Sequence, residues 1–584
     1  MTQESTVLTG GERLADALVR HGVDTLFTLP GGHISPIFVS AKARGVRIID
    51  VRDEANAVFA ADATARLTGN IGVAVVTAGP GLTNTLTPLR NALMARSPVV
   101  LLCGATATVL RGRGSLQDID QLSAVRSHVK WAGQVNRAED LIPMFAQAVE
   151  IARTGPTGPV ALECPVDLLY NSTLVREMYG VAKPLPAGAP LSQRLERWYL
   201  ERHLRKTLGT SPVVDDTSMP SAPKRTKPSP RAVARARALL DGAKKPVLLI
   251  GSQAMEAPQE AAALAQAVTA LGVPVYLAGM ARGLLGATHP LQLRQQRKEA
   301  LREADVVLLA GTPMDFRLDY GRHFRHGTTI ITANSDASEL QRNRRATLGV
   351  HGDADLFVRA LATSAPRAEW SAWLEILQGR DAAREAEIDT RAAAVVTPIN
   401  PLALCKAIDG LLSDDSMIVA DGGDFVATAA YTLRPRAPLS WLDPGVFGTL
   451  GVGAGFAIGA KLHRPSADVW LIYGDGAAGF SVIEFDTMVR HGIPVIAVVG
   501  NDGAWAQIMR DQVPMLGDDV ATVLGRTAFH GVADALGAKG FLLDDPAKME
   551  STLRAARDTA RAGTPVIVNA HIGLTDFRKG SISL

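Results

Sequence analysis

Two apolar segments separated by a helical stretch, each followed by a short polar turn, constrain the fold of this chain most strongly. Residues 468–473 are nearly all apolar, residues 481–491 have helical spacing, and residues 494–499 are apolar again. This order predicts one βαβ unit of a parallel sheet. Because such a crossover is right-handed and its connections are short, both polar turns should lie at the carboxyl edge of one sheet, where open α/β sheets bind ligands.

The two turns carry residues suited to a metal-bound diphosphate. Asp475 lies in the first turn, and Asn501 and Asp502 lie in the second, so we expect these side chains to face one cavity. Mg²⁺ takes oxygen ligands and usually accompanies phosphates, while Gly474 and Gly476 allow backbone N–H groups to approach those phosphates. The pair of turns therefore predicts a magnesium diphosphate site.

This segment resembles the signature of thiamine diphosphate-dependent enzymes, a GDG turn followed one βαβ unit later by two asparagines. The resemblance implies that the metal is held by Asp475, by Asp502, which comes 27 residues later (502 − 475 = 27), and by the backbone carbonyl of Ala504. It also implies that Ala477 contacts the cofactor and that Asn501 orients the diphosphate. Asp502 departs from the family pattern, which has Asn there, and it adds negative charge beside the diphosphate.

A glutamate far from this segment extends the resemblance. Glu54 follows the predicted strand at 46–51 and begins a helical stretch that ends at Gly69. In this family such a glutamate hydrogen-bonds the pyrimidine ring of the cofactor and favours the imino tautomer, which removes the thiazolium C2 proton. Alone, Glu54 would more simply complement a helix dipole. The GPG turn and Asn84 that follow resemble the acetolactate synthase group, favour the catalytic role and imply that Asn84 contacts the cofactor.

The resemblance assigns further residues on the pyrimidine side of the cofactor. Gly31 and Gly32 belong to an LPGGH turn that approaches the reaction centre in this family. His33, which follows, is a candidate polar partner of the substrate, although a histidine in a loop is equally often only solvated. Gln117 corresponds to a glutamine that lines the active site in the acetolactate synthase group.

Other residues are assigned to the diphosphate side. The backbone N–H groups of Asp424 and Phe425 would contact the diphosphate, since carboxylates would be repelled by it. Gly448 and Leu450 belong to a segment whose large apolar residue props the cofactor in its bent shape. For Leu450 an ordinary core position is compatible with that role.

Length and pattern predict an α/β protein with three doubly wound parallel-sheet domains. The resemblance implies that these domains have the thiamine diphosphate-binding fold and assigns their roles. A chain of 584 residues with 47% hydrophobic content can form several domains with proper cores. The predicted boundaries are a pyrimidine-binding domain at 1–183, a linker with one amphipathic helix at 184–230, a central nucleotide- or CoA-binding domain at 231–365, a helical linker at 366–399, a diphosphate-binding domain at 400–573, and a C-terminal tail at 574–584 that could act as a lid.

Composition argues against several classes of partner. The 61 basic and 58 acidic side chains leave a net charge of +3, which gives no global field to attract nucleic acid or a membrane surface. Cys103, Cys164 and Cys405 are far apart and predict buried thiols rather than disulfides or a zinc site. No signal segment or membrane-length apolar run is present, so we expect a cytoplasmic location.

The activity implied by the resemblance is carbon–carbon bond chemistry carried by the cofactor. Segments such as 441–462, 481–502 and 575–584 resemble members of the group that cleave 2-hydroxyacyl-CoA to formyl-CoA and an aldehyde or ketone, a reversible reaction. The alternatives are acetolactate formation from pyruvate and oxalyl-CoA decarboxylation. A non-catalytic member of the fold is disfavoured by Glu54. The resemblance implies a homodimer as the minimum active unit, with the cofactor shared between subunits, and a homotetramer as the expected assembly.

The central domain separates these alternatives. Pro313 stands where FAD-binding members have an arginine, and proline brings neither charge nor an N–H, so FAD is not expected there. Related members bind ADP or the nucleotide of CoA in this domain. Candidates for such a site are residues at strand ends and two nearby arginines: Arg282, Arg317, Asn334, Ser335, Asp353 and Ala354.

Overall fold

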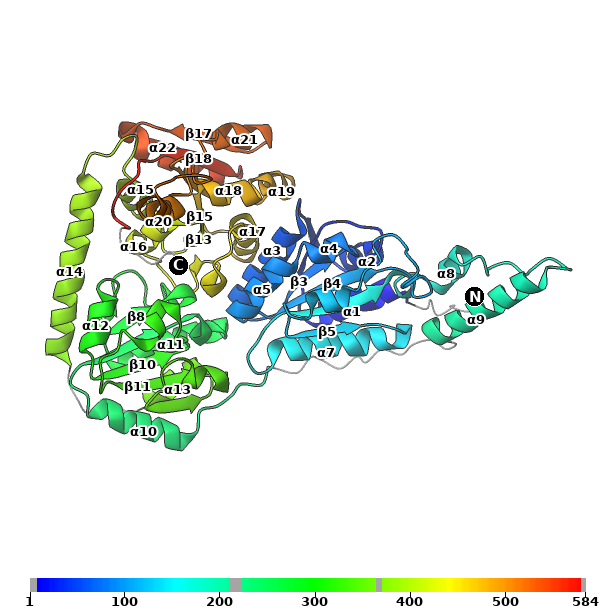
Figure 1. Cartoon of the computed structure of the whole chain (residues 1–584), viewed down its shortest axis with the longest axis horizontal. Coiled ribbons are helices and arrows are strands. Elements are labelled where there is room, and N and C mark those ends of the chain that lie inside the picture. The colour runs from blue at the N-terminus through cyan, green and yellow to red at the C-terminus, as the bar shows by residue number, and fades with distance from the viewer. Residues whose placement is uncertain (1–7, 210–222, 364–369, 579–584) are drawn as a thin grey trace. The chain divides into compact units, whose positions relative to one another are not determined.

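The computed structural model describes residues 8–209, 223–363 and 370–578. These residues form three six-stranded sheets in which all strands are parallel, and helices alternate with the strands along the chain (Figure 1). The chain separates into two compact units. One holds the first sheet and extends to Pro223 without Leu67–Gly69, and the other comprises Leu67–Gly69 and the residues from Lys224 onward and holds the second and third sheets. The predicted α/β class with three parallel sheets is confirmed.

The first sheet has the strand order β2-β1-β3-β4-β6-β5. Its strands are β1 (Thr25–Thr28), β2 (Arg47–Asp50), β3 (Gly72–Val76), β4 (Val99–Ala105), β5 (Trp131–Gln134) and β6 (Val160–Pro165). The helices of this unit are α1 (Gly10–Arg20), α2 (Ser35–Ala43), α3 (Glu54–Thr68), α4 (Pro80–Thr83), α5 (Leu86–Ala95), α6 (Gln121–Val125), α7 (Leu141–Arg153), α8 (Ser172–Met178) and α9 (Leu191–Leu208).

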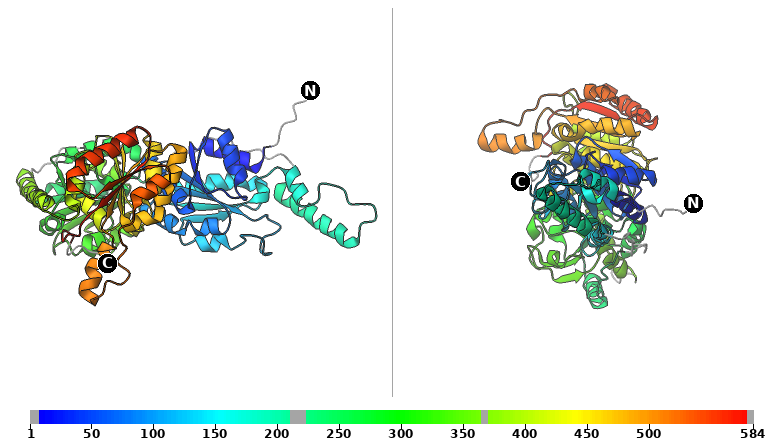
Figure 2. Two further views of the ribbon diagram at one scale, coloured as in Figure 1. Left: turned by 90° about the horizontal axis from the view of Figure 1, so that it is seen from above. Right: turned by 90° about the vertical axis from the view of Figure 1, so that its right-hand side faces the viewer.

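Helices cover both faces of the first sheet because its central strands are apolar on both sides. All five residues of β3 and all seven of β4 are buried. Val73 and Val75 pack into a core with α1, α2 and α7, so Ala74 and Val76, which alternate with them, point to the opposite face. Figure 2 shows helices on both sides of these strands and the long helix α9, which packs against α8 through a small cluster of its own.

The second sheet has the order β12-β11-β10-β7-β8-β9. Its strands are β7 (Pro246–Ile250), β8 (Val275–Leu277), β9 (Gln292–Leu293), β10 (Val306–Ala310), β11 (Thr329–Asn334) and β12 (Leu348–His351). The accompanying helices are α10 (Pro230–Asp241), α11 (Ala261–Leu271), α12 (Arg297–Glu303), α13 (Ala354–Leu361) and the 23-residue α14 (Ser371–Ala393), which leads to the third sheet.

The third sheet has the order β14-β13-β15-β16-β18-β17. Its strands are β13 (Met417–Asp421), β14 (Trp441–Leu442), β15 (Val469–Gly474), β16 (Ile496–Asn501), β17 (Lys539–Leu543) and β18 (Val566–His571). Its helices are α15 (Pro401–Asp409), α16 (Asp424–Thr432), α17 (Gly453–His463), α18 (Asp475–Ser481), α19 (Phe485–His491), α20 (Ala506–Leu516), α21 (Phe529–Ala535) and α22 (Met549–Arg561).

One local expectation needs correction. The pattern predicted a turn at Asp475 and a helix over residues 481–491, but α18 begins at Asp475 itself and α19 begins only at Phe485. Glycine and alanine fill α18, so this helix has no apolar stripe for a periodicity argument to detect. Asp475 is consequently the first residue of a helix, where the helix dipole favours a negative charge.

Several other expectations concern single elements or residues. Helix α9 lies within the predicted linker at 184–230, although residues 210–222 of that linker lie outside the described residues, as do the tail residues 579–584. Cys103, Cys164 and Cys405 are buried and unbridged. Among the helices of the described residues, none combines the length and apolar character that crossing a bilayer requires.

Candidate active site

Asp475 joins the two predicted turns at the carboxyl edge of the third sheet. Strands β15 and β16 are parallel neighbours with Gly474 opposite Gly500, so the residues that follow them meet at this edge. Asp475 is buried, and its carboxylate accepts N–H groups from Gly476 and from Gly503, each at 2.7 Å. One side chain therefore connects the two turns that the sequence pattern placed at one edge of the sheet.

Asp502 brings a second carboxylate to the same edge. It lies just after β16, is half-buried and accepts the N–H of Ala504 at 3.1 Å. Burial and the nearby negative charge of Asp475 raise the pKa of Asp502 to about 7. Burial likewise raises the pKa of Asp475. Two desolvated carboxylates repel each other, so a divalent cation between them would stabilise this edge.

The donor set fits Mg²⁺ better than a transition metal. The predicted ligands are two carboxylates and the backbone carbonyl of Ala504, all oxygen atoms. Across the described residues, no three or more His, Cys, Asp or Glu side chains gather as a metal-binding group. The side-chain oxygen of the fully buried Asn501 also has no hydrogen-bond partner within the described part of the chain.

The amide nitrogen of Asn501 faces the neighbouring strand. It donates to the carbonyl of Thr527 at 3.0 Å and to the side chain of Asn569, in β18, at 3.1 Å. Asn569 itself is fully buried. The predicted role of Asn501 in orienting the diphosphate stays a prediction, while the structure adds a partner, Asn569, that the sequence reasoning missed.

Glycines allow the backbone turns at this edge to come close together. A Cβ atom on Gly476 would lie 2.2 Å from the ring of Trp505, and one on Gly422, where φ is +145°, would lie 2.7 Å from the backbone nitrogen of Gly474. The start of α16 is thus brought against the start of α18. The first N–H groups of α16 lack intrahelical acceptors and can bind an anion.

Asp424 and Phe425, predicted to contact the diphosphate through their N–H groups, begin α16. The carboxylate of Asp424 forms a close ion pair with Arg510 of α20, which offsets its negative charge. The ring of Phe425 packs on Gly500, where a Cβ would approach it to 2.3 Å. Arg510 was not predicted, because 86 residues separate it from Asp424.

Gly448 and Leu450 lie on a segment that is attached to β13. Gly448 has a left-handed conformation with φ of +65°, and Leu450 is half-buried rather than a core residue. Directly after them, Gly451 and Gly453 donate their N–H groups to the buried carboxylate of Asp421 at 2.8 to 3.2 Å. Burial raises the pKa of Asp421 to about 7.

Glu54 and Asn84 meet at the carboxyl edge of the first sheet. Glu54 is the first residue of α3 and is 5% exposed. The amide nitrogen of Asn84 donates to Oε2 of Glu54 at 3.0 Å. Gly81 lies beside the other oxygen, Oε1, and a Cβ on this glycine would be 3.5 Å from Oε1. Two residues assigned separately to the cofactor are therefore in direct contact.

His33 lies at the same edge and pairs with Thr77, which follows β3. Its Nδ1 lies 3.1 Å from the hydroxyl of Thr77, and burial lowers the pKa of His33, so the imidazole is neutral at pH 7. Gly31 packs on the same threonine, where a Cβ would lie 2.4 Å away, whereas Gly32 has open space around it. The predicted LPGGH turn thus packs directly on the end of β3.

Gln117 lines a cavity of about 370 Å³ at the ends of β4, β5 and β6. It has a left-handed backbone with φ of +63°, and its carbonyl lies 2.9 Å from the Cβ that Gly79 lacks. The same cavity is lined by Gln121 and Glu163, which are both buried and which the sequence reasoning missed. A polar residue in the middle of an apolar strand, Glu163, was the available signal.

A larger pocket of about 570 Å³ lies in the second unit, between the second sheet and the segment that follows α16. Its lining is strongly basic, with a single acidic residue, Glu299. The basic lining side chains are Arg282, Arg294, Arg297, Lys298, Arg317, Arg384 and Arg578.

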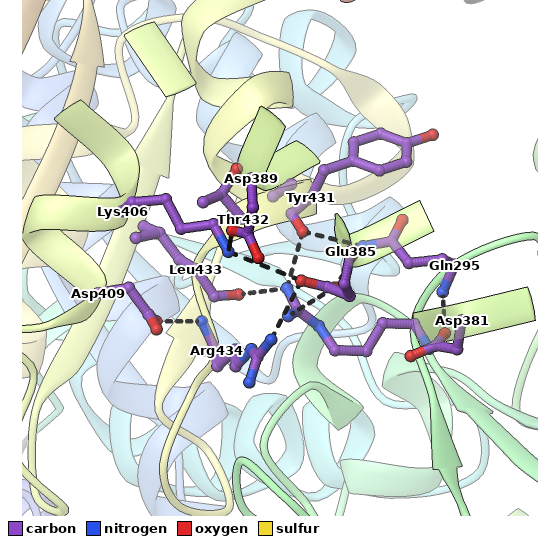
Figure 3. A network of polar contacts seen from close by, with 12 residues as sticks. Gln295, Asp381, Glu385, Asp389, Lys406, Asp409, Tyr431, Thr432, Leu433 and Arg434 are labelled. Carbon is purple, nitrogen blue, oxygen red and sulfur yellow. Dashed lines mark hydrogen bonds and ion pairs between the residues drawn. The ribbon is translucent and has the colours of Figure 1, made fainter. Parts of the chain in front are cut away.

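Carboxylates of α14 hold part of this lining in place. Glu385 accepts from Gln295 at 2.8 Å and pairs with Arg294 at 3.3 Å and Arg434 at 3.0 Å. Arg294 and Gln295 also donate to the carbonyl of Tyr431 (Figure 3). These contacts join the second sheet to the end of α16 and fix one wall of the pocket.

Of the six predicted nucleotide contacts, Arg282 and Arg317 line the pocket and the other four do not. Arg282 donates to the carbonyl of Ala430 and lies over the ring of Trp441, and Arg317 pairs with Asp315. The other four have structural partners or burial of their own. Asn334 bonds Gln253, the carbonyl of Ser335 meets His351, Asp353 pairs with Arg225, and Ala354 is buried at the start of α13.

Family models match all three sheets. The model of the thiamine pyrophosphate enzyme N-terminal TPP binding domain matches residues 8–124, that of the central domain matches 233–361, and that of the C-terminal TPP binding domain matches 421–570. Together with the two carboxyl edges described above, these matches define the class. The chain belongs to the thiamine pyrophosphate enzyme family. Thiamine pyrophosphate and thiamine diphosphate are two names for the same cofactor.

Three relatives indicate which members of the family this chain resembles. The chain is 47% identical to 2-hydroxyacyl-CoA lyase 2 of Homo sapiens, with 100% of this chain and 93% of the relative covered. It is 46% identical to 2-hydroxyacyl-CoA lyase 2 of Danio rerio, with 100% and 94% covered. An acetolactate synthase large subunit of Mycobacterium tuberculosis is 33% identical, with 98% and 97% covered.

Proposed function

We propose that this protein is a thiamine diphosphate- and Mg²⁺-dependent lyase that splits 2-hydroxyacyl-CoA into formyl-CoA and an aldehyde or ketone, and that also runs the reverse condensation. The observation that carries this proposal is the identity of 46% and 47% to 2-hydroxyacyl-CoA lyase 2 proteins over the whole chain. Both values exceed the 33% identity to an acetolactate synthase large subunit over a similar length.

The residues at the two sheet edges divide the work of holding the cofactor. When bound, thiamine diphosphate supplies an electron sink beside the substrate carbonyl. Asp475, Asp502 and the carbonyl of Ala504 would hold Mg²⁺ and through it the diphosphate. Glu54 would hold a proton on the pyrimidine ring, in a geometry fixed by Asn84 at 3.0 Å.

His33 and Gln117 would meet the polar groups of the substrate. Because burial lowers the pKa of His33, its neutral ring can accept a proton from a 2-hydroxyl group. Gln117 would donate to the thioester carbonyl. Both assignments follow from their positions at the edge that holds Glu54, within one compact unit.

The basic pocket of about 570 Å³ supports a CoA thioester over a small keto acid. Burial lowers the pKa of Arg282 to about 10 and also lowers those of Arg294 and Arg297, yet all three stay protonated at neutral pH. Desolvated guanidinium groups gain stability from phosphate oxygens, which they bind in pairs. The phosphates of CoA supply this charge, whereas pyruvate has none to offer.

The proposal includes a homodimer as the minimum active unit, a homotetramer as the assembly, and a cytoplasmic location. The support for the assembly is that Glu54 and Asp475 lie in different compact units, and that family members share the cofactor between subunits. FAD is not part of the proposal, since Pro313 takes the place of the arginine that would meet it.

Product analysis tests the reaction. The purified protein, loaded with thiamine diphosphate and Mg²⁺, is incubated with 2-hydroxyacyl-CoA thioesters of several chain lengths, with pyruvate and with oxalyl-CoA. We expect formyl-CoA and the shortened aldehyde or ketone by mass detection, from the first group only. Acetolactate from pyruvate, or formyl-CoA from oxalyl-CoA alone, would replace the proposal by one of its two alternatives.

A variant of the pocket tests the CoA assignment. Arg297→Ala should raise KM for a 2-hydroxyacyl-CoA by roughly 10–100-fold, because a hydrogen bond to a charged group contributes about 1.5–3 kcal/mol. The same variant should leave KM for the matching pantetheine thioester, which lacks the nucleotide, unchanged. Arg302→Ala is the control, since Arg302 is an exposed arginine of the same helix outside the pocket. Equal effects on both thioesters would remove the pocket from the proposal.

A further inference from the structure

We infer that Gln121 and Glu163 are positioning residues for the pyrimidine-activating glutamate, Glu54, and act through the turn that begins at Gly79. This inference rests on the proposed role of Glu54. Neither residue reaches Glu54 itself, so each acts through other groups.

The side-chain amide of Gln121 connects three strand ends. Gln121 begins α6 and is 3% exposed. Its Oε1 accepts the N–H of Gly79 at 3.0 Å, and its Nε2 donates to the carbonyl of Gly104 and to Oε2 of Glu163, both at 3.0 Å. The amide has one acceptor end and one donor end, so these partners fix its orientation. In the reversed orientation its NH₂ group would face the N–H of Gly79, and its oxygen would face the carbonyl of Gly104 and the carboxylate of Glu163.

Glu163 holds the amide in that orientation. It lies in β6, is 3% exposed and receives hydrogen bonds on both oxygens. Oε2 is bonded to Gln121, and Oε1 is bonded to Arg111 at 3.0 Å and closely to Gln134. A buried carboxylate is costly unless it is paired, so Arg111 and the two amides hold the Glu163 side chain stationary.

The bond to Gly79 matters because this glycine leads directly into the segment that carries Asn84. Gly79 has φ of +62° and is the N-cap of α4, and the next residue, Pro80, has no N–H with which to anchor the turn. Helix α4 then leads in a single turn to Asn84, which donates to Oε2 of Glu54. A movement of Gly79 is therefore passed to Asn84 and to the carboxylate of Glu54.

This chain of contacts differs from ordinary core packing in one testable way. Loss of the bond to Gly79 should disturb the proton held by Glu54 more than it disturbs the folding of the domain. A displacement of a catalytic group by about 1 Å costs roughly 100-fold in rate. We therefore expect Gln121→Met, which keeps the size of the side chain, to act mainly on cofactor activation.

The direct measurement is the exchange of the cofactor C2 proton for deuterium in the loaded, full-length protein, followed by quenched-flow NMR. Gln121→Met should slow this exchange roughly 10–100-fold. In the protein without cofactor, hydrogen exchange followed by mass spectrometry should show faster exchange of the Gly79 amide. The matched control is Gln134→Met, which removes another partner of Glu163 but makes no bond to the turn. Because Arg111 and Gln121 still hold Glu163 in this variant, it should slow C2 exchange less than Gln121→Met does and leave the Gly79 amide closer to its parent rate.

A charge swap extends the test to Glu163. Gln121→Glu alone places two carboxyl groups together, so the C2 exchange rate relative to the parent should be low at pH 8 and recover as the pH falls and one carboxyl takes up a proton. Adding Glu163→Gln should restore part of the rate at pH 8, since an amide again faces a carboxylate.

The inference is overturned if Gln121→Met and Gln134→Met give the same C2 exchange rates, or if the Gly79 amide exchanges at the parent rate in Gln121→Met. It is also overturned if the swap restores nothing. These outcomes are separable from a failure of the lyase proposal, because C2 exchange needs the cofactor but no acyl-CoA substrate.

Discussion

The first and third sheets place their corresponding strands in the same spatial order, yet their carboxyl edges differ in chemistry. In each, the first strand of the sheet lies between the second and the third, and the last two strands are exchanged, as in β2-β1-β3-β4-β6-β5 and β14-β13-β15-β16-β18-β17. The second sheet follows a different order, with its first strand, β7, between β8 and β10. Topology alone therefore sets the first and third sheets apart as a related pair.

The two edges differ in how their carboxylates are treated. At the first edge, Glu54 is held by the amide of Asn84, and Glu163 is paired with Arg111. At the third edge, burial raises the pKa of Asp475, and burial together with the charge of Asp475 raises the pKa of Asp502. In the proposed function, the first edge holds the activating acid Glu54 in a fixed geometry, and the third edge receives a cation. The proposal thus assigns proton placement to one domain and charge neutralisation to the other, although both sheets have the same strand order.

Removing the acid at the first edge should have the largest effect. Glu54→Gln keeps the shape of the side chain but cannot share a proton with the pyrimidine ring, so kcat should fall by at least roughly 100-fold. Cofactor affinity, measured by calorimetric titration, should change little. Asp53→Asn is the control, because asparagine caps a helix about as well as aspartate. Near-normal turnover in Glu54→Gln would contradict the division of labour between the two edges.

Removing the central carboxylate of the third edge should act on binding instead. Asp475→Ala deletes the side chain that accepts N–H groups from both turns, and it should weaken thiamine diphosphate binding in the presence of Mg²⁺ by roughly 10–100-fold. Titration calorimetry with and without Mg²⁺ measures this. Asp545→Asn, at a helix start elsewhere in the same domain, should bind as the parent does. An unchanged affinity for Asp475→Ala would remove the metal assignment.

Substitution of the second carboxylate, Asp502, should have a smaller effect. It should stabilise the protein without cofactor but weaken the binding of Mg²⁺ and cofactor. Asp502→Asn removes the repulsion from Asp475, so the protein without cofactor should unfold at a temperature higher by about 2 °C, as expected for less than 1 kcal/mol in a chain of this size. The variant should also bind Mg²⁺ and cofactor a few-fold more weakly than the parent does, and so gain less stability from them. Differential scanning calorimetry of both forms checks both signs. A lower unfolding temperature of the free variant would show that Asp502 is not strained by its neighbour.

The remaining effect concerns the pH dependence of stability. Burial raises the pKa of Asp421 to about 7, so the folded state binds this proton more tightly than the unfolded chain, whose aspartates titrate near 4. The stability contributed by the neutral carboxyl is therefore present below about pH 4 and is lost as the pH rises through about 7.

Asp421→Asn should flatten this slope, whatever its effect on absolute stability. Urea denaturation of the parent and the variant at pH 5 and pH 8 compares the two slopes. Asp415→Asn, an exposed neighbour of the same strand, is the control and should leave the slope unchanged. A parent-like slope in Asp421→Asn would mean that the N–H groups of Gly451 and Gly453 fully offset the burial of the carboxylate.

Residues at strand ends were predictable, and their partners were not. Asp475 and Asp502 could be placed together because each follows an apolar strand of one βαβ unit, and parallel strands end at the same edge. The pairings of Asp424 with Arg510, Asn501 with Asn569, and Gln121 with Glu163 join residues 86, 68 and 42 positions apart. No local sequence pattern predicts such contacts, because they depend on the order of the strands within each sheet.

The basic pocket shows the same limit. Arg282 and Arg317 were predicted from their positions beside strand ends, whereas Arg294 and Arg297 come from a loop and a helix start, which no motif marks. Arg578 belongs to the C-terminal tail that the sequence predicted as a possible lid. The four remaining candidates were chosen by analogy with strand ends in related proteins. In this chain they pack inside the second sheet's own domain, away from the lining of the pocket.

By itself, the sequence determined the alternation of apolar strands and helices, hence three parallel sheets, and the acids and glycines that follow particular strands. These are properties of neighbouring residues and of a helical or strand period. The tertiary structure decided which acids share a desolvated edge, which are neutralised by distant arginines, and which amide supports the turn beside Glu54. Burial and long-range pairing set the energy of a charge, and both exist only once segments far apart in the chain have packed together.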